Sequence, residues 1–505
     1  MSLARVSTVG LIGLQGNIIE VEVDISDGLP NYTLLGLPDT ALSESRERVR
    51  SALVNTGENW PNKKVTVSLS PAWLPKSGSS FDLPIAIALL QAQGILPVDD
   101  QAIYLGELSL GGELRTIRGV LPALIAAKRL GFVRALVPIG NLREGRAVQG
   151  IEVIGASHLG EVLRFMRTGE FPTSAENEAV VEPRAFAVDF ADVAGQLHAK
   201  RALEIAAIGG HHILFIGPPG TGKTMLAERI PTILPPLHLD DALEVAALQS
   251  INGTLIAGEI SQRAPYVAPH HSTTSVGMVG GGAHIVRPGS CSLAHNGVLF
   301  IDEAPECGRG VLDSLRQPLE SGSVTITRSI GSITYPSKFI LVLAANPCPC
   351  GKFSGRGRAC TCSSLSIRRY LQRISGPLLD RIDLRIFVDR PTRVEISEID
   401  SGESSAVIRT RVIEARSRAK ERFNGEPWQL NSEIPAAALR KKYGASKDAM
   451  AFLHSELDAE RLSARGFHKV LRISWSVADS NGHQTPSLED LQSALTMRTA
   501  GEVNL

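Results

Sequence analysis

The fold is decided by Gly217-Pro218-Pro219-Gly220-Thr221-Gly222-Lys223-Thr224, a short stretch of a 505-residue chain. It follows the apolar run 212–216 and precedes a helical pattern at 225–229, so it predicts a strand, a glycine loop and a helix in that order. Glycines let successive backbone N–H groups turn inward around a phosphate, and the following helix N-terminus favours negative charge. Lys223 is expected to reach the β- and γ-phosphates, and the Thr224 hydroxyl is expected to ligate Mg²⁺. The stretch therefore predicts a nucleotide site.

Two further strands are predicted to end in polar side chains that suit hydrolysis. The apolar run 298–301 ends in Asp302 and Glu303. We assign to Asp302 the water shell of Mg²⁺ and to Glu303 the activation of the attacking water as general base. Another apolar run, 339–345, ends at Asn346, whose amide suits hydrogen bonds to the γ-phosphate and to the water. The plainer interpretation of Asn346 is a turn residue before the following proline.

Charge and hydropathy narrow the classes of function. The 52 Lys and Arg residues balance the 52 Asp and Glu residues, so contact with a nucleic acid would need a local basic patch rather than a global field. No apolar run approaches the roughly 18 residues that a membrane helix needs. The N-terminus, Met1-Ser2-Leu3-Ala4-Arg5, lacks a signal-peptide pattern. We expect a soluble, cytoplasmic protein without a membrane partner, in about three domains.

Residues 1–167 are predicted to form an α+β domain, because strand-like runs alternate with helical patterns. One helix is predicted over 40–54, with Leu42, Val49 and Leu53 on its buried side, and two more over 83–91 and 121–129. The stretch Pro75-Lys76-Ser77-Gly78-Ser79-Ser80 resembles the loop that carries the nucleophile of Lon-type proteases, with Ser80 at the position of the nucleophile. Where the resemblance calls for the lysine that deprotonates this serine, the chain has Leu121. An unactivated serine is a poor nucleophile. The resemblance therefore implies a Lon-like fold that is not proteolytic.

These motifs, in this order, resemble AAA+ ATPases and specifically the magnesium-chelatase-related family that contains YifB and ComM. The resemblance covers essentially the whole chain and is carried by Gly36-Leu37-Pro38-Asp39, Glu44-Ser45-Arg46-Glu47-Arg48-Val49, Pro269-His270-His271-Ser272, Ser292-Leu293-Ala294-His295-Asn296-Gly297 and Leu315-Arg316-Gln317-Pro318-Leu319-Glu320. It implies ATP and Mg²⁺ as cofactors. With the polar stretch 168–187 as a linker, it implies an α/β P-loop AAA+ core over 188–395 and a helical lid over 396–505.

The same resemblance implies roles for two arginines. Arg381, within residues 375–383, would be presented to the nucleotide of the neighbouring subunit in a ring, where a guanidinium stabilises charge on the transferring phosphoryl group. A surface ion pair with an adjacent aspartate is the simpler role for Arg381, and Arg373 competes for the catalytic one. Arg465 is our choice for the second sensor arginine, with Arg472 as the fallback.

ComM-type members imply a hexameric, ATP-dependent DNA motor, and so a branch-migration helicase of recombination intermediates in natural transformation, with recombination proteins as candidate partners. A Gly-rich segment at 277–282 would belong to an insert that points into the pore of the ring in this family. Residues 322–335 predict a β-hairpin with Arg328 near its tip, and repeated weak contacts of this kind suit a ring that holds phosphates. Otherwise Arg328 is simply a solvated turn residue.

Two other functions stay open at this point. The ATPase could act as a switch or a chaperone that remodels a protein partner, with the Lon-like domain as the docking surface. The third choice is the ATPase subunit of a metal chelatase, against which we count the presence of the Lon-like domain.

Four of the six cysteines form two C-x-C pairs close together: Cys348, Cys350, Cys360 and Cys362. Four thiolates would complete a tetrahedral Zn²⁺ site, although C-x-C is tighter than the usual zinc spacing. Free buried thiols are the alternative. The Gly- and Arg-rich segment 352–358 offers no core in which to bury them, so we expect zinc to order this loop. Cys291 and Cys307 are expected to be structural.

Overall fold

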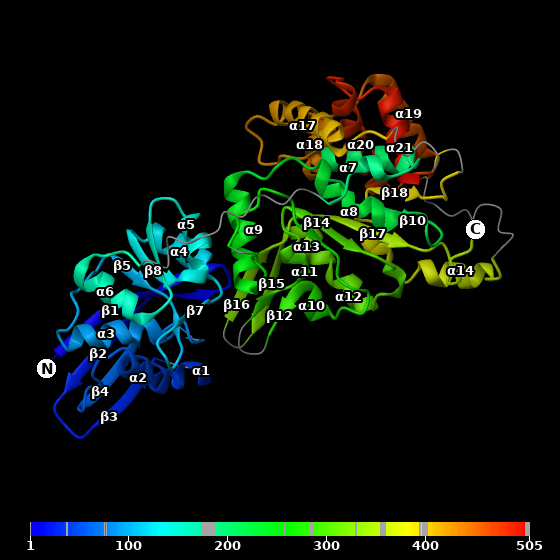
Figure 1. Cartoon of the computed structure of the whole chain (residues 1–505). Helices are drawn as coiled ribbons and strands as arrows, with labels where there is room; N and C mark the ends of the chain where they lie inside the picture. The colour runs from blue at the N-terminus through cyan, green and yellow to red at the C-terminus, as the bar shows by residue number, and fades with distance from the viewer. Residues whose placement is uncertain are drawn as a thin grey trace.

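The computed structural model describes residues 2–36, 39–74, 76, 78–172, 187–256, 258–282, 286–328, 331–353, 360–392, 395 and 402–499. Two β-sheets, each with its own helices, form the first two parts of the molecule, and a group of helices forms the third (Figure 1). Most of the linker predicted at 168–187 falls outside the described residues. None of the helices in the described ranges is long and apolar enough to cross a membrane.

The N-terminal domain is built on a mixed seven-stranded sheet in the order β3-β4-β2-β1-β5-β8-β9. Its strands are β1 (Ser2–Ile12), β2 (Gln15–Ser26), β3 (Asn31–Leu35), β4 (Lys64–Ser70), β5 (Ala102–Tyr104), β8 (Arg134–Pro138) and β9 (Glu152–Ala156), with a small ladder of β6 (Glu107–Leu108) and β7 (Leu114–Arg115) beside it. In β2 and β4 every second residue is buried, because successive side chains of a strand point to opposite faces. One face of these strands therefore supplies the domain core.

Helices cover this sheet, and those that the apolar patterns predict at 40–54, 83–91 and 121–129 are among them. The helices of this domain are α1 (Thr40–Ser43), α2 (Ser45–Asn55), α3 (Asp82–Ala92), α4 (Val120–Arg129), α5 (Leu142–Arg146) and α6 (Leu159–Thr168). The single helix predicted at 40–54 is divided by a turn at Glu44. Its predicted stripe of Leu42, Val49 and Leu53 is fully buried, so the periodicity located the buried face correctly.

The ATPase core contains a fully parallel five-stranded sheet in the order β11-β14-β17-β10-β18. Its strands are β10 (Ile213–Ile216), β11 (Tyr266–Val267), β14 (Gly297–Ile301), β17 (Phe339–Ala345) and β18 (Leu384–Phe387). Ile213 and Phe215 enter one hydrophobic cluster, whereas Leu214 and Ile216 enter another on the opposite face. Burial on both faces explains why these strands are continuously apolar in the sequence.

Helices pack on both faces of this sheet. The helices of this part of the chain are α7 (Leu197–Gly209), α8 (Lys223–Ile233), α9 (Leu239–Asn252), α10 (Ser275–Val279), α11 (Ser290–Leu293), α12 (Arg309–Ser314), α13 (Arg316–Ser321), α14 (Ser364–Leu371), which lies beyond the edge of the sheet (Figure 1), and α15 (Gly376–Leu379). Two antiparallel ribbons accompany them: β12 (Gly280–Gly281) with β13 (Arg287–Pro288), and β15 (Ser323–Arg328) with β16 (Gly331–Pro336). The second ribbon is the hairpin that the sequence predicts, although its tip residues 329–330 lie outside the described residues.

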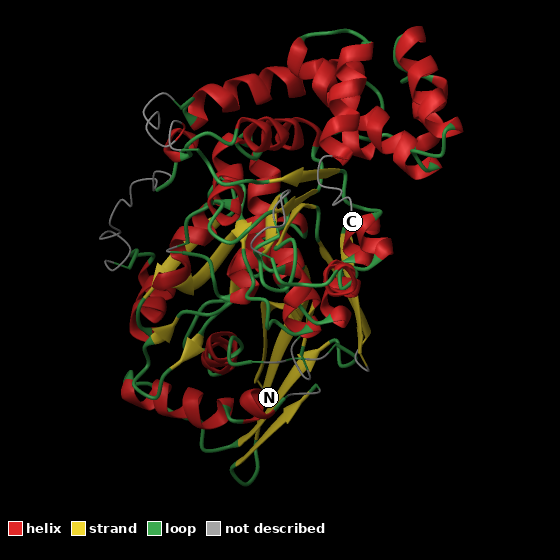
Figure 2. Ribbon diagram, turned by 90° about the vertical axis from the view of Figure 1, so that its right-hand side faces the viewer, coloured by secondary structure: helices red, strands yellow, loops and turns green. Residues whose placement is uncertain are grey.

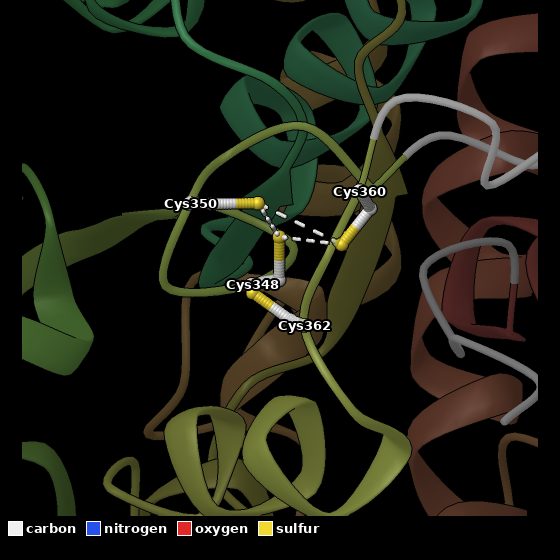
Figure 3. Close-up of side chains that lie close together, drawn as sticks. All are labelled: Cys348, Cys350, Cys360 and Cys362. Carbon is white, nitrogen blue, oxygen red and sulfur yellow. Dashed lines mark hydrogen bonds between the residues drawn. The ribbon is translucent and has the colours of Figure 1, made fainter.

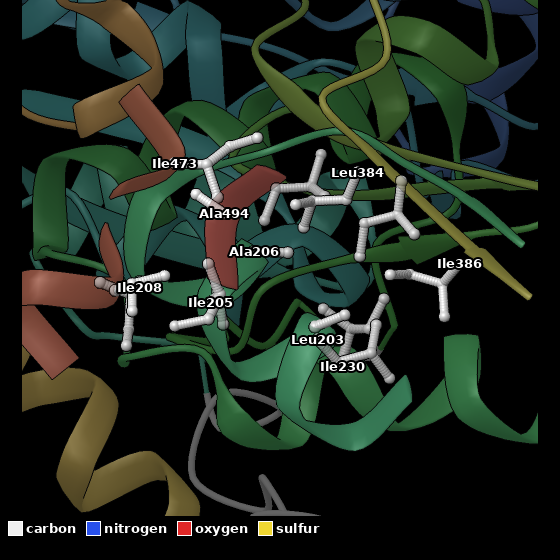
Figure 4. Close-up of a cluster of buried hydrophobic side chains, with 14 of the residues drawn as sticks. Leu203, Ile205, Ala206, Ile208, Ile230, Leu384, Ile386, Ile473 and Ala494 are labelled. Atoms are coloured by element: carbon white, nitrogen blue, oxygen red, sulfur yellow. The ribbon is translucent and has the colours of Figure 1, made fainter. Parts of the chain in front are cut away.

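The C-terminal region is helical and packs against α7, α8 and β18 (Figures 1 and 2). Its helices are α17 (Ser405–Arg422), α18 (Ala436–Lys441), α19 (Lys447–Asp458), α20 (Ala464–Asn481) and α21 (Leu488–Thr499). Figure 4 shows how Leu203 and Ile205 of α7, Leu384 of β18, Ile473 of α20 and Ala494 of α21 share one apolar cluster. This region is therefore part of the same core as the parallel sheet.

A buried ion pair crosses the same boundary. The Lys469 ammonium donates to Asp383 Oδ1 at 2.7 Å, and both side chains are at most one-tenth exposed. Burial opposes the ionisation of Asp383, but Lys469 and His211 outweigh it and hold the pKa of this carboxyl well below its usual value. Because a buried charge is costly without its partner, the pair fixes α20 against the start of β18.

The N-terminal domain rests on α9 of the ATPase core. The Gly119 amide donates to the carbonyl oxygen of Ser250 at 3.2 Å and lies 3.1 Å from its Oγ, and this hydroxyl donates to Glu144 at 2.7 Å. Ala246 and Ala247 of α9 belong to the same apolar cluster as the buried side of α4. A Cβ added at Gly13, in the β1–β2 turn, would lie 2.6 Å from Ile333 of β16. The domain therefore contacts both α9 and the predicted hairpin.

Candidate nucleotide-binding site

The glycine loop joins the buried end of β10 to the first residue of α8. Gly217 has no room for a side chain, because a Cβ would lie 2.1 Å from the carbonyl oxygen of Val388. Gly220 and Gly222 have φ values of +75° and +88°, which disfavour other residues, and nothing lies within 4 Å of a Cβ at either position. The loop borders a hollow of about 430 Å³. Its uncrowded backbone and the adjoining helix N-terminus fit a bound phosphate chain.

Lys223 lies inside this loop. Its Nζ donates to the carbonyl oxygens of Gly217 at 2.7 Å and Pro218 at 2.9 Å, and it lies 3.4 Å from Asn346 Oδ1. Burial lowers the pKa of this lysine, while Asp302 and Glu303 favour its charged form. The cation is thus held by carbonyl oxygens that phosphate oxygens could replace. Lys223 and Asn346, assigned from separate strand ends, are brought together.

The Thr224 hydroxyl and Asp302 lie side by side. Thr224 Oγ1 donates to Asp302 Oδ2 at 2.8 Å, and Asp302 Oδ1 accepts from the Glu303 amide at 2.8 Å. A hydroxyl next to a carboxylate is an oxygen donor set that fits Mg²⁺. Glu303 has φ +48° and ψ +42°, a left-handed conformation that is uncommon outside glycine and is often found at functional sites. The chain turns sharply here, and both acids line the pocket.

A second hollow, of about 340 Å³, adjoins the first and also borders Thr224, Asp302 and Glu303. His271 borders this hollow, and the sequence motifs did not assign it a role in the site. His271 Nδ1 lies 3.5 Å from Glu303 Oε2, and the ring of His270 lies 4.0 Å from the His271 ring. The sequence held one indication of this contact. Both histidines follow β11, and β11 is the neighbour of β14 in the parallel sheet. Because the carboxyl ends of parallel strands lie at one edge of a sheet, residues that follow these two strands come close together.

Arg381 and Arg465 do not contact the glycine loop in the described residues. Arg381 donates to the carbonyl oxygen of Pro377 at 2.6 Å and forms an ion pair with Glu320. Arg465 Nη1 lies 3.0 Å from Asp380, the residue before Arg381. The two arginines therefore lie close to each other, and their assigned roles in nucleotide chemistry stay predictions.

The two alternative arginines have other partners. Arg373 forms an ion pair with Glu306 at 3.0 Å, directly after the acidic end of β14. Arg472 donates to the carbonyl oxygen of Ile434 at 2.8 Å within the C-terminal helices, and burial lowers its pKa. Arg472 thus has a structural contact inside the helical region, whereas Arg373 contacts the segment that follows Glu303.

The four clustered cysteines converge (Figure 3). All four Sγ atoms lie within 4.8 Å of one another. Cys348 Sγ lies 3.3 Å from Cys350 Sγ and 3.6 Å from Cys360 Sγ, close to the roughly 3.8 Å that a tetrahedron with Zn–S bonds of about 2.3 Å requires. The expectation that no core buries these thiols is wrong for Cys348, which is fully buried at the end of β17. Residues 354–359, most of the Gly- and Arg-rich segment, lie outside the described residues.

In the N-terminal domain, the position at which the resemblance to Lon-type proteases calls for a lysine is occupied by a core residue, Leu121. Leu121 has no exposed surface and belongs to the apolar cluster that α9 joins. The backbone carbonyl of Ser80 accepts from the Gly106 amide at 3.1 Å, and no described contact links the Ser80 hydroxyl to a basic side chain. The Lys76 ammonium donates to the carbonyl oxygen of Pro71. Pro75 and Ser77 of this loop lie outside the described residues.

The predicted insert and the predicted hairpin touch each other. Arg328 Nε lies 3.4 Å from the carbonyl oxygen of Gly282, and Arg328 Nη1 donates to the carbonyl oxygen of Thr327 at 3.0 Å. Gly281 of the insert pairs with the exposed Arg287, and a Cβ on Gly281 would lie 3.4 Å from the Arg328 guanidinium. Two arginines thus lie on adjoining ribbons.

Comparison with known proteins agrees with the order of these parts. The family model "Magnesium chelatase, subunit ChlI" matches residues 189–396, "Subunit ChlI of Mg-chelatase" matches 21–141, and "Magnesium chelatase, subunit ChlI C-terminal" matches 402–498. The uncharacterized protein YifB of Escherichia coli is 41% identical, over 99% of this chain and 97% of that protein. The competence protein ComM of Haemophilus influenzae is 40% identical, over 99% and 98%. A Lon protease of Syntrophomonas wolfei is 30% identical over 160 residues, which are 29% of this chain and 20% of that protein.

Proposed function

Because the chain belongs to the YifB/ComM family of magnesium-chelatase-like AAA+ ATPases, we propose that it is a hexameric DNA motor that uses ATP to move branch points in recombination intermediates. The name of one relative, the competence protein ComM, supports a role of this kind in natural transformation. The structural observation that carries the DNA part is the pair of arginines, Arg287 and Arg328, on adjoining ribbons of the ATPase core.

In this proposal, different residues of the pocket carry out different steps of ATP hydrolysis. Lys223 and the loop amides bind and orient the phosphates, and Asn346 donates its amide N–H to the γ-phosphate or accepts a hydrogen bond from the attacking water. Glu303 takes the proton of that water as general base. Thr224 and Asp302 are placed to hold Mg²⁺, which supplies charge neutralisation when bound.

Arg381 serves the neighbouring subunit in this proposal. In its own chain the Arg381 side chain is about four-fifths covered and is paired with Glu320, and Arg465 forms an ion pair with the adjacent Asp380. An arginine already held in one orientation by an acid loses little conformational entropy when it meets a phosphate. The ring contact would exchange Glu320 for the partner's nucleotide, and Arg465 would support the same surface as part of the helical lid.

The DNA contact is proposed for the pore side of the ring. The described hydrogen bonds of the Arg328 guanidinium are to carbonyl oxygens rather than to a carboxylate. Its charge is therefore not neutralised by an acid in these contacts. Six copies of Arg287 and Arg328 around a pore would hold phosphates through many weak contacts, which needs no net positive charge of the whole chain.

Removal of these arginines tests the DNA part. We expect the double variant Arg287→Ala/Arg328→Ala to bind DNA at least about tenfold more weakly, with a flatter dependence on salt because fewer counterions are released. Arg5→Ala is the matched control, because Arg5 is an exposed arginine paired with Glu22 on the N-terminal sheet. Equal DNA affinity of both variants and the parent, at every salt concentration, would refute this interface.

The presence of the N-terminal domain does not separate this chain from metal chelatases. A family model described as a ChlI subunit of Mg-chelatase matches residues 21–141, which lie inside this domain. The DNA proposal is favoured over metal insertion by the two arginines alone. A role in remodelling a protein would predict ATP hydrolysis that is stimulated by a protein partner and is indifferent to DNA.

Zinc is the second cofactor that we propose. The four thiolates within 4.8 Å of one another form a closed donor set of the kind that structural zinc sites use. Mass spectrometry of the native protein should find about one zinc per chain. A zinc-free protein with all four thiols open to alkylation would contradict this part and would leave the ATPase proposal intact.

A further inference from the structure

The cysteine cluster lies directly next to the nucleotide pocket along the chain. Asn346 follows the last residue of β17, and Cys348 comes two residues later with no exposed surface. The Gly351 amide then donates to the Cys348 carbonyl oxygen at 2.9 Å. The segment that supplies the first two thiols thus begins at the side chain that lies 3.4 Å from Lys223.

The cluster also packs against the glycine loop. Gly351 has φ +71°, and a Cβ added there would lie 2.7 Å from both Cγ and Cδ of Pro219. Real Cβ atoms essentially never lie this close to other heavy atoms. The turn within the cysteine segment is therefore in tight contact with the loop that is expected to hold the phosphates. This contact is independent of the chain connection through Asn346.

The second pair of thiols belongs to a different segment of the chain. Cys360 and Cys362 directly precede α14, whose N-terminal cap is Ser363. Beyond this helix, Arg373 contacts Glu306, close to the general base. An ion bound by all four sulfurs would thus tie three segments together: the end of β17, the turn against Pro219 and the start of α14.

We propose that the four thiolates and their zinc form a brace for the nucleotide pocket, so that ATP affinity depends on the metal. The Zn–S bonds would join these segments to one another, and metal binding contributes directly to the order of the segments that supply its ligands. Without zinc, Pro219 and Asn346 lose a rigid neighbour, and the loop must be ordered when ATP binds. This inference rests on the proposed ATP and zinc sites and adds a coupling between them.

The first test removes the metal. The full-length protein is treated with a zinc-selective chelator in excess Mg²⁺, and zinc content and the Kd for a fluorescent ATP analogue are measured together. We expect the Kd to rise by at least about thirtyfold, the scale on which disordered binding segments lose affinity, and to recover when Zn²⁺ is added back. An unchanged Kd after complete loss of zinc would overturn the coupling. Failure of the untreated protein to bind ATP would instead overturn the proposed function.

The second test leaves the zinc in place and disturbs only the contact. Gly351→Ala should weaken ATP binding by about tenfold while zinc stays at about one per chain, because the added carbon must displace Pro219. Gly425→Ala is the matched control: Gly425 has φ +83°, so the backbone cost is similar, but nothing lies within 4 Å of its Cβ. If both variants bind ATP like the parent, the contact between Gly351 and Pro219 does not affect ATP affinity, and the proposed brace is refuted.

Discussion

The two sheets of this protein differ in what they place next to a helix N-terminus. In the ATPase core, the first residue of α8 is Lys223, whose ammonium lies among carbonyl oxygens beside a pocket. In the N-terminal domain, the second residue of α4 is Leu121, which is fully buried against apolar neighbours. Both domains keep their apolar patterns. The comparison teaches that a fold persists through its core, whereas its chemistry depends on a few polar residues at strand ends.

The polar groups of the two sheets differ in the same way. Arg48 holds Asp82 through Nε at 2.7 Å, and Asp82 is fully buried beside the loop that resembles the Lon nucleophile loop. Burial raises the pKa of Asp82 to about 6, although Arg48 opposes the shift. Such a satisfied pair is structural. Asp302 and Glu303, in contrast, stand at the edge of an open pocket.

The largest effect is expected at Arg381, for which we propose a contact with the neighbouring subunit of a ring. Arg381→Ala should lower ATP hydrolysis by about 10³–10⁵-fold, the worth of an arginine finger in other NTPases. Mixing this variant with Lys223→Ala chains should restore hydrolysis, because a mixed ring joins an intact Lys223 site to an intact Arg381. Steady-state ATPase activity against mixing ratio checks this.

Arg373→Ala is the control for this assignment, since Arg373 is the competing arginine and is paired with Glu306, shortly after Glu303 of its own chain. Rescue by Arg373→Ala chains but not by Arg381→Ala chains would assign to Arg373, instead of Arg381, the role of the arginine that acts on the neighbouring subunit's nucleotide. No excess over the sum of the two mutants, in rings shown to be mixed, would exclude Arg381 as a residue that acts in trans.

The next effect separates binding from chemistry inside the pocket. Glu303→Gln should hydrolyse ATP at least about a hundredfold more slowly while it still binds ATP, because general base catalysis is lost and the phosphate contacts are kept. Lys223→Ala should lose binding itself. Ser80→Ala, the corresponding change in the N-terminal domain, should leave both activities at the parental level. Binding titrations and turnover assays check this, and parental turnover in Glu303→Gln would show that the base is another group.

A stability effect is expected at Leu121, a buried apolar residue at the position where the resemblance to Lon-type proteases calls for a lysine. Leu121→Lys should destabilise the domain by about 3–5 kcal/mol, because it buries an unpaired charge, and should not create peptidase activity. At about 2–4 °C per kcal/mol, the first thermal transition should fall by about 10 °C. Leu121→Met, which preserves volume, should cost less than about 1.5 kcal/mol. Equal melting of the two variants would mean that residue 121 is accessible to solvent.

The smallest effect is expected at His271. Its contact with Glu303 is 3.5 Å long and joins two half-exposed side chains, so it is worth about 1 kcal/mol or less. We expect His271→Ala to lower kcat about threefold to fivefold with little change in KM for ATP. His198→Ala, an exposed histidine at the start of α7, is the control. A large rise in KM would place His271 in binding rather than in the orientation of Glu303.

The sequence was informative where one local pattern suffices. Apolar periodicity located β10, β14, β17 and the paired strands β15 and β16, because burial on one or both faces is recorded residue by residue. It did not separate α1 from α2, since a turn at Glu44 changes no apolar position. His271 and Pro219 could not be related to their partners in the same way. Their contacts depend on which strands are neighbours and on the packing of one turn, and neither leaves a spacing in the chain.

Branch migration on a mobile four-way DNA junction tests the central claim most directly. Purified parental protein should convert the junction to duplex products when ATP and Mg²⁺ are present and should leave it intact without ATP. Glu303→Gln should bind the junction without moving it, because ATP binding is kept and turnover is lost. Parental protein that hydrolyses ATP rapidly and binds the junction, yet moves it no faster with ATP than without, would contradict the account.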